Sequence, residues 1–182
     1  MIWDQDKYIK AWNYASVIHQ GQTLPGKDIP YLNHLGLVAM EAMAATTNGI
    51  GSEDPTLLIL CAVLHDAIED TECTYDDIKL IFGSNVAEGV LALSKDKRLP
   101  TKQEQMEDSI YRIQKQPKSI WMVKLCDRIT NLQPPPAHWN STKIALYQEE
   151  ARYILKHLGK ANEYLANRLD NKIQNYNQFI KE

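Results

Sequence analysis

The chain has 182 residues, of which 44% are hydrophobic and 24% charged, as is typical of one soluble globular domain. Its 20 basic and 23 acidic residues give a net charge of −3 and are scattered, which disfavours a nucleic-acid-binding surface or an anionic-membrane surface. The longest apolar run, residues 57–64, is too short to span a membrane, and the N-terminus lacks the order of a signal peptide, so we expect a cytoplasmic protein.

Helix start and stop signals recur along the chain, with no alternating strand pattern of useful length and no internal repeat. Asp54 before Pro55 and the capping patterns that begin at Thr74 and Thr101 mark three helix starts. The expected helices run from about 4–20, from near 34 to 48, from 55 through the motif HDAIED, over 75–82, 84–93, 102–116 and 119–132, and then as two long helices separated at Gly159.

This pattern predicts an all-α fold, a single bundle of about eight to ten helices that includes residues 1–182. The triple proline at 134–136 ends a helix, because proline cannot continue one. It is too short to separate two domains. The amphipathic last helix would permit a homodimer.

The stretch AVLHDAIEDT, residues 62–71, carries the strongest chemical signal, with His65, Asp66, Glu69 and Asp70 directly after an apolar run. On one continuous helix, at about 100° per residue, these four side chains would share one arc. Acids at a helix C-terminus oppose the macrodipole at a cost of about 0.3 to 1 kcal/mol each, and buried like charges need a cation. A bound metal ion therefore explains the cluster better than a solvated helix end does.

Two residues elsewhere in the chain are candidate partners for this cluster. His34 follows PYLN at a helix start, and Asp127 lies in VKLCDRITNL among apolar neighbours. With His65 and Asp66 they would form a site of two nitrogens and two oxygens, suited to Mn²⁺, Fe²⁺ or Zn²⁺. The remaining histidines lie on an apolar helix face or lack acidic neighbours, and they are not expected to bind metal: His19, His138 and His157.

At these residues the sequence resembles the HD superfamily of metal-dependent phosphohydrolases, whose ligand order is H…HD…D. More specifically, it is similar to the hydrolase domain of the Rel/Spo alarmone family and to the stand-alone small alarmone hydrolases. The resemblance covers nearly the whole chain and rests on PYLNHLGLVA (30–39), VLHDAIEDT (63–71), SKDKRLP (94–100), VKLCDRITNL (123–132) and WNSTKIALYQEEA (139–151).

The resemblance implies removal of the 3′ pyrophosphate from (p)ppGpp, usually with Mn²⁺, by a chain that carries no synthetase domain. It assigns His34, His65, Asp66 and Asp127 as metal ligands. It also matches two acids to the pair that orients or deprotonates the attacking water, with Glu69 the expected base beside Asp70. The positions that face the nucleotide in the family correspond here to Lys97, Asn131, Lys143 and Tyr147.

One loop departs from the family pattern. The guanosine-directed family has an Arg-Lys pair before the PY dipeptide, and the arginine stacks on the base, whereas Leu24 stands at that position here. Lys27 cannot stack as a planar guanidinium does. An adenine alarmone, (p)ppApp, is therefore as reasonable a substrate as (p)ppGpp.

Two other classes of function stay open. One is another HD phosphohydrolase, either a 5′-nucleotidase or a dinucleotide 2′-phosphatase that acts on NADPH. The other is a nucleotide-binding module without turnover. The intact ligand set and the pair Glu69 and Asp70 argue against the module, and WNSTKIALY favours the alarmone hydrolase over the nucleotidase.

Overall fold

The structure is a computed structural model that describes residues 2–180. Within this range the chain forms α-helices, two 3-10 turns and no β-strand, and the only β-type pairing is an isolated bridge between Thr23 and Pro30. The all-α prediction is confirmed. The helices are α1 (Gln5–Ile18), α2 (Leu32–Thr47), α3 (Pro55–Leu64), α4 (Ala67–Asp70), α5 (Tyr75–Phe82), α6 (Ser84–Leu93), α7 (Lys102–Ile113), α8 (Lys118–Asn131), α9 (Ser141–Leu158) and α10 (Glu163–Tyr176).

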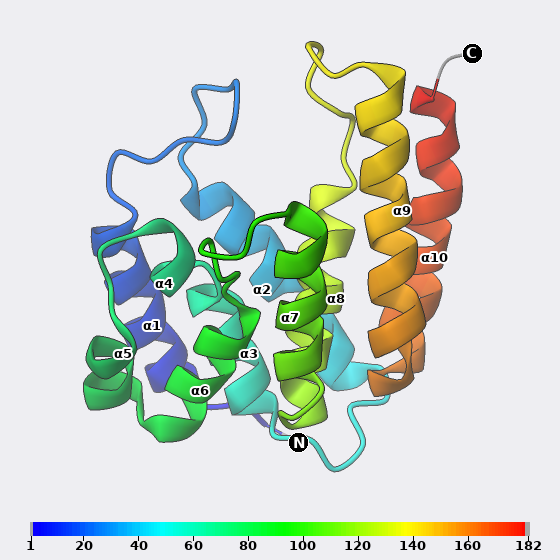
Figure 1. Cartoon of the computed structure of the whole chain (residues 1–182). Coiled ribbons are helices and arrows are strands. Elements are labelled where there is room, and N and C mark those ends of the chain that lie inside the picture. The colour runs from blue at the N-terminus through cyan, green and yellow to red at the C-terminus, as the bar shows by residue number, and fades with distance from the viewer. Residues whose placement is uncertain (1, 181–182) are drawn as a thin grey trace.

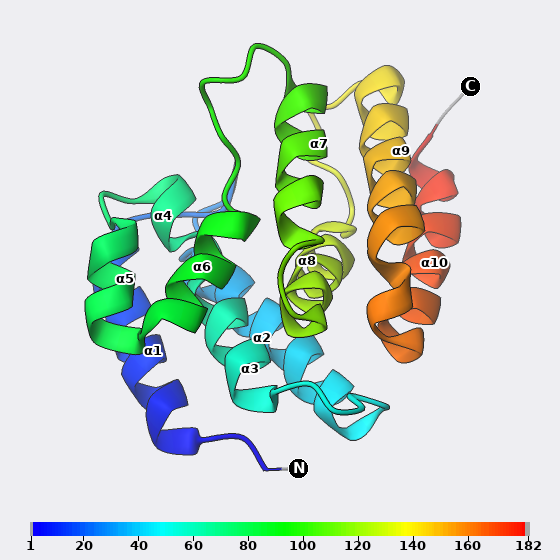
Figure 2. The ribbon, with the colours of Figure 1, turned by 60° about the horizontal axis from the view of Figure 1, so that its bottom comes forward.

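The bundle is built around α3, which packs against α1, α2, α6 and α8, and α8 in turn packs against α9 and α10. Figure 1 shows α9 and α10 side by side along one flank, with α1 and α5 on the opposite flank. Figure 2, which brings the lower end forward, shows the same separation. The loop before α2 and the loop between α8 and α9 both extend from the upper end in Figure 1.

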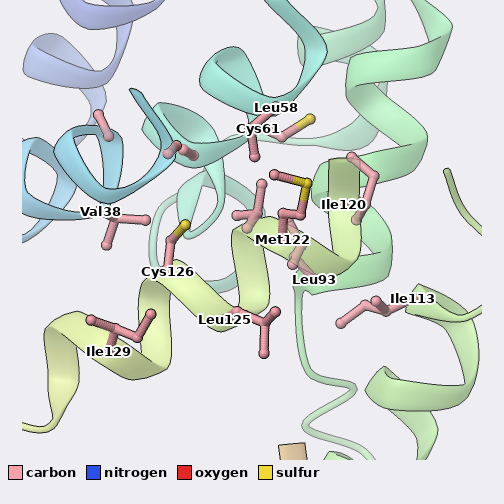
Figure 3. Packing of buried hydrophobic residues seen from close by; sticks show 14 of the residues in the cluster. Val38, Leu58, Cys61, Leu93, Ile113, Ile120, Met122, Leu125, Cys126 and Ile129 are labelled. Atoms are coloured by element: carbon pink, nitrogen blue, oxygen red, sulfur yellow. The ribbon is translucent and has the colours of Figure 1, made fainter. Parts of the chain in front are cut away.

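The core explains why α3 is so apolar. Every residue of α3 except Thr56 is buried, so this helix has no solvent-facing side. In Figure 3, Leu58 of α3 and Met122 and Cys126 of α8 lie in one cluster with Val38 of α2. A rigid, fully enclosed α3 fixes the position of the residues that follow its last turn. None of the helices in residues 2–180 combines the length and apolar character that a membrane span requires.

Several helix ends follow the predicted caps. The side chain of Asp54 accepts hydrogen bonds from the amides of Thr56 and Leu57 at the start of α3. Thr74 and Thr101 each form a complete capping box, at the starts of α5 and α7. Gly83 ends α5 with φ at 90°, a conformation that glycine adopts without a Cβ penalty.

One sequence prediction at this core is wrong. The third helix does not continue through the motif HDAIED but ends at Leu64, and α4 follows as a separate turn after His65 and Asp66. Asp66 has φ −99° and ψ 1°, outside the helical range. The four polar side chains therefore do not share one helical arc. His65 and Asp66 lie 2.9 Å apart, whereas Glu69 and Asp70 bond to residues 95 and 97.

Smaller differences concern the ends of α1 and α7 and the start of α2. α1 ends at Ile18 rather than near Gln20, and α2 begins at Leu32 rather than at His34. Ser84 begins α6 as expected but makes no side-chain cap bond. α7 ends at Ile113 rather than at residue 116, and Ile180 lies beyond the end of α10 and is half-buried.

Candidate metal centre and adjoining cavity

The four predicted ligands come together at one end of the bundle. His34 comes from the first turn of α2, His65 follows α3, and Asp127 belongs to the last turn of α8. These three residues are buried, and each offers a ligand atom within 4.8 Å of the others. Oδ2 of Asp66 lies 2.9 Å from Nε2 of His65 and 3.6 Å from Nε2 of His34. Three helices that are distant in sequence thus bring two nitrogens and two carboxylates to one point.

The two imidazoles face each other across this point. Nδ1 of His65 lies 2.9 Å from the carbonyl oxygen of Ala62 and donates to it, which directs Nε2 inward. Nε2 of His34 is 3.2 Å from Nε2 of His65 and 3.5 Å from Oδ1 of Asp127. In neutral rings both of these nitrogens would be acceptors, and a metal cation between them would satisfy both.

The electrostatics of the cluster favour positive charge. Burial alone would lower the pKa of His65, but the carboxylates of Asp66 and Asp127 outweigh it and raise this pKa to about 10. Burial alone would raise the pKa of Asp127, but Lys124 and the two histidines outweigh it and hold this pKa well below its usual range. The donor set and its charge therefore fit a divalent transition-metal ion, which prefers imidazole and carboxylate ligands.

Each carboxylate of the cluster is held by donors outside it. Asp127 accepts from Nζ of Lys124 at 3.0 Å and from Nδ2 of Asn131 at 2.5 Å. Asp66 accepts from the hydroxyl of Tyr31 at 2.5 Å. Such outer partners orient a metal ligand and are generally needed for its full affinity.

Two of these partners, Lys124 and Tyr31, were not predicted from the sequence. Lys124 precedes Asp127 by three residues on the same helix, and this spacing was a readable signal for an ion pair. Tyr31 and Asp66 are 35 residues apart. No periodicity in the sequence connects them, so only the packing of the loop before α2 reveals this contact.

The two acids proposed for the chemistry lie on α4, directly after Asp66. Oε2 of Glu69 accepts from the backbone amide of Lys95 at 2.8 Å, and Glu69 is half-buried. Asp70 is exposed and pairs with Nζ of Lys97 at 3.3 Å, and the same Nζ donates to the carbonyl of Glu69 at 2.6 Å. Lys97 therefore lies beside the acid pair. Lys97 and Glu69 both line a cavity of about 450 Å³. Other residues that line this cavity are Ile68, Lys95, Arg98 and Arg112.

A cavity of about 280 Å³ opens beside His34. Two of the residues predicted to contact substrate, Asn131 and Tyr147, line it, and so does Leu24. Trp139 also lines it, with its ring edge-on to Tyr147 at 5.1 Å between centroids. The cavity thus joins aromatic rings and an amide side chain directly to the metal centre.

Of the other predicted substrate contacts, Lys143 lies outside the residues that line this cavity. Its ammonium group is 4.4 Å from the centre of the Trp139 ring. Lys97 instead lines the cavity of about 450 Å³ that Glu69 also lines. The four predicted contacts therefore divide between two regions, and the sequence analysis did not single out Trp139, although this residue opens the motif WNSTKIALY.

Comparisons with known proteins identify the family of this chain. The profile of the HD domain family matches residues 11–170. A guanosine-3′,5′-bis(diphosphate) 3′-pyrophosphohydrolase MESH1 from Xenopus tropicalis is 32% identical over 171 residues, which cover 89% of this chain and 90% of that protein. The Homo sapiens protein of the same name is 29% identical over 170 residues, covering 88% and 89%.

A longer bacterial relative and one solved structure extend the comparison. A guanosine-3′,5′-bis(diphosphate) 3′-pyrophosphohydrolase from Aquifex aeolicus (strain VF5) is 30% identical over 163 residues, which cover 88% of this chain but 21% of that protein. A solved structure described as a metazoan ortholog of SpoT that hydrolyzes ppGpp has a TM-score of 0.82, 24% identity and full coverage of both chains. This likeness shows that the two proteins share a fold.

Proposed function

Because the chain belongs to the HD-domain family, we propose that it is a metal-dependent 3′-pyrophosphohydrolase of alarmone nucleotides, with (p)ppGpp as substrate. The convergence of buried His34, His65 and Asp127 with half-buried Asp66 beside a cavity supports this proposal most strongly. The names of the relatives that match nearly the whole chain support the choice of substrate.

The proposed reaction is a transfer of the pyrophosphoryl group to water. One water molecule attacks the phosphorus atom that is attached to the ribose O3′, and the bond between that phosphorus and O3′ breaks. From ppGpp the products are GDP and pyrophosphate, and O3′ leaves with a proton. The attacking water loses its proton to a base, so a carboxylate close to the reacting phosphorus is required.

In this proposal His34, His65, Asp66 and Asp127 hold one divalent ion, for which we propose Mn²⁺. When bound, such an ion lowers the pKa of water and neutralises charge that develops on a phosphoryl group. Asn131 and Lys124 keep Asp127 oriented through the hydrogen bonds described above.

Glu69 is the proposed base. Its Oε2 is fixed by the amide of Lys95, which leaves Oε1 as the atom that takes the proton of the attacking water. Asp70 is proposed to orient that water. Lys97 supports both acids, since it bonds to the Glu69 carbonyl and the Asp70 carboxylate, and its exposed ammonium group is available to a substrate phosphate.

The nucleoside is proposed to occupy the cavity beside His34, where Tyr147 and Asn131 are its contacts and Lys143 lies beyond Trp139.

Two features of the cavity lining favour (p)ppApp as a second substrate. Leu24 lines this cavity and offers no guanidinium for stacking on guanine. In addition, none of the described residues that line the cavity is acidic, so none offers a carboxylate to the N–H groups of guanine.

The loop can be tested by replacing Leu24 with arginine. We expect the ratio of kcat/KM for ppGpp to that for ppApp to rise about two- to fivefold, as roughly 0.5 to 1 kcal/mol of a cation–π contact predicts. The control is Leu80→Arg, which adds the same charge at an exposed position on α5. It should leave the ratio unchanged. An unchanged ratio in both variants would mean that Leu24 does not govern the choice of base.

Product analysis distinguishes the proposed activity from its alternatives. The protein is incubated with Mn²⁺ and, separately, with ppGpp, ppApp, NADPH and nucleoside 5′-monophosphates. The proposal predicts pyrophosphate together with a nucleoside diphosphate from an alarmone. Orthophosphate from NADPH or from a monophosphate, with the alarmones left intact, would instead identify a 2′-phosphatase or a 5′-nucleotidase. Binding without any product would identify a nucleotide-binding module.

A further inference from the structure

The hydroxyl of Tyr31 contacts the atom of Asp66 that faces the metal centre. It donates to Oδ2 at 2.5 Å, and this same oxygen lies 2.9 Å from Nε2 of His65. A carboxylate oxygen accepts hydrogen bonds, so the hydroxyl of Tyr31 is the donor in this contact. The bond holds one carboxylate oxygen of Asp66 in a fixed direction.

The ring of Tyr31 packs against two histidines. The His19 ring stacks on it with a centroid distance of 5.3 Å and an interplanar angle of 25°, and the tilted His34 ring lies at the same centroid distance with an interplanar angle of 50°. His19 is 2% exposed. Its Nδ1 lies 2.6 Å from Oε1 of Gln22. His19, which is not expected to bind metal, is therefore part of the packing around the candidate metal centre.

Gln22 connects this group to the turn that carries the acids. Its Nε2 donates to the carbonyl of Asp70 at 2.5 Å, so its Oε1 is the acceptor for Nδ1–H of His19. The backbone carbonyl of Gln22 accepts from the amide of Tyr31 at 2.9 Å. Gln22 and Tyr31 therefore close the neck of the loop 23–30, and their side chains reach the two ends of the segment 66–70.

We propose that Tyr31 is a positioning residue that fixes Asp66 for the metal ion, and that His19 and Gln22 hold Tyr31 in place. The inference rests on the metal centre proposed above. The loop 23–30 also carries Leu24, which lines the nucleotide cavity. The hydrogen bonds of Tyr31 and Gln22 at the ends of this loop therefore help to position both the wall of the cavity and the carboxylate of Asp66. Outer-shell partners of this kind commonly contribute about 10- to 100-fold to metal affinity or activity.

The test is Tyr31→Phe, which keeps the ring that packs against the two histidines and removes only the hydroxyl. The dissociation constant of Mn²⁺ is measured on metal-stripped protein by calorimetry, without substrate. We expect it to rise about 10- to 100-fold. The melting temperature of metal-free Tyr31→Phe should match that of the control variant described in the next paragraph. Saturating Mn²⁺ should restore most of the kcat of Tyr31→Phe. A purely structural role would lower the melting temperature instead and leave the Mn²⁺ affinity of the folded protein unchanged.

The matched control is Tyr153→Phe. Tyr153 is also half-buried and its ring also packs on a histidine, with 4.3 Å between its centroid and that of His157. This variant should bind Mn²⁺ as the wild type does. A second variant, Gln22→Ala, removes the bond to the Asp70 carbonyl and should weaken Mn²⁺ binding by a smaller factor than Tyr31→Phe.

Two failures can be told apart. If the wild type binds Mn²⁺ and folded Tyr31→Phe binds it with the same affinity, the positioning role is wrong while the proposed hydrolase stands. If the wild type binds no divalent ion at all, the metal centre itself is wrong, and the role of Tyr31 falls with it.

Discussion

Replacing Asp127 by alanine is expected to abolish metal binding and turnover together. Asp127 is the one carboxylate that α8 adds to the cluster, and its removal leaves Lys124 buried without its partner. We expect Mn²⁺ affinity and kcat/KM to fall by more than the roughly 100-fold that outer-shell partners alone contribute. Calorimetry with Mn²⁺ and a pyrophosphate-release assay measure the two losses on the same preparation.

A conservative variant separates this effect from unfolding. Asp127→Asn keeps the size of the side chain and removes the charge, so the bundle should still melt cooperatively while most of the metal affinity is lost. The control is Asp170→Ala, which removes an exposed acid from α10 and should change neither quantity. Wild-type Mn²⁺ binding by folded Asp127→Asn would remove Asp127 from the ligand set.

Replacing Glu69 is expected to have the opposite pattern, with metal retained and rate lost. The Glu69→Gln side chain can still accept from the amide of Lys95, so α4 should keep its position, but an amide cannot take a proton from water. If Glu69 is the base, kcat falls by about 10² to 10⁴ while Mn²⁺ affinity stays within a fewfold of the wild type. Glu69→Ala should show at least the same loss.

Glu72→Gln provides the control for this variant, since Glu72 is exposed and follows Glu69 by three residues. Its kcat should be that of the wild type. Near-normal turnover by Glu69→Gln would show that another group, with Asp70 the first candidate, takes the proton. Loss of Mn²⁺ from Glu69→Gln would mean that Glu69 acts through the metal ligands rather than on water.

Much of the fold could be predicted because its helix ends are encoded locally. The caps at Asp54, Thr74 and Thr101 depend on side chains within three residues of each start. The end of α3 was not predictable in this way. Asp66 leaves the helical conformation within a segment that has neither glycine nor proline, and neighbouring contacts such as the bond between His65 and the Ala62 carbonyl accompany the bend.

In the candidate site, too, some features could be predicted from local sequence and others depend on tertiary contacts. The four candidate ligands could be proposed from residue type and apolar context, and their side chains lie close together in the structure. The contact of Tyr31 with Asp66 and the place of Trp139 in the cavity could not, because both depend on how two long loops fold back onto the bundle. Chemistry of this kind arises from tertiary packing and leaves no spacing in the sequence.

The central claim is that divalent metal at this centre enables the release of pyrophosphate from an alarmone. The most direct test uses metal-stripped protein, incubated with and without Mn²⁺ and with ppGpp or ppApp in separate reactions. We predict pyrophosphate and nucleoside diphosphate in equal amounts, formed only when Mn²⁺ is present, and the ratio of the two rates gives the base preference. No pyrophosphate from either nucleotide at saturating Mn²⁺ would contradict the account.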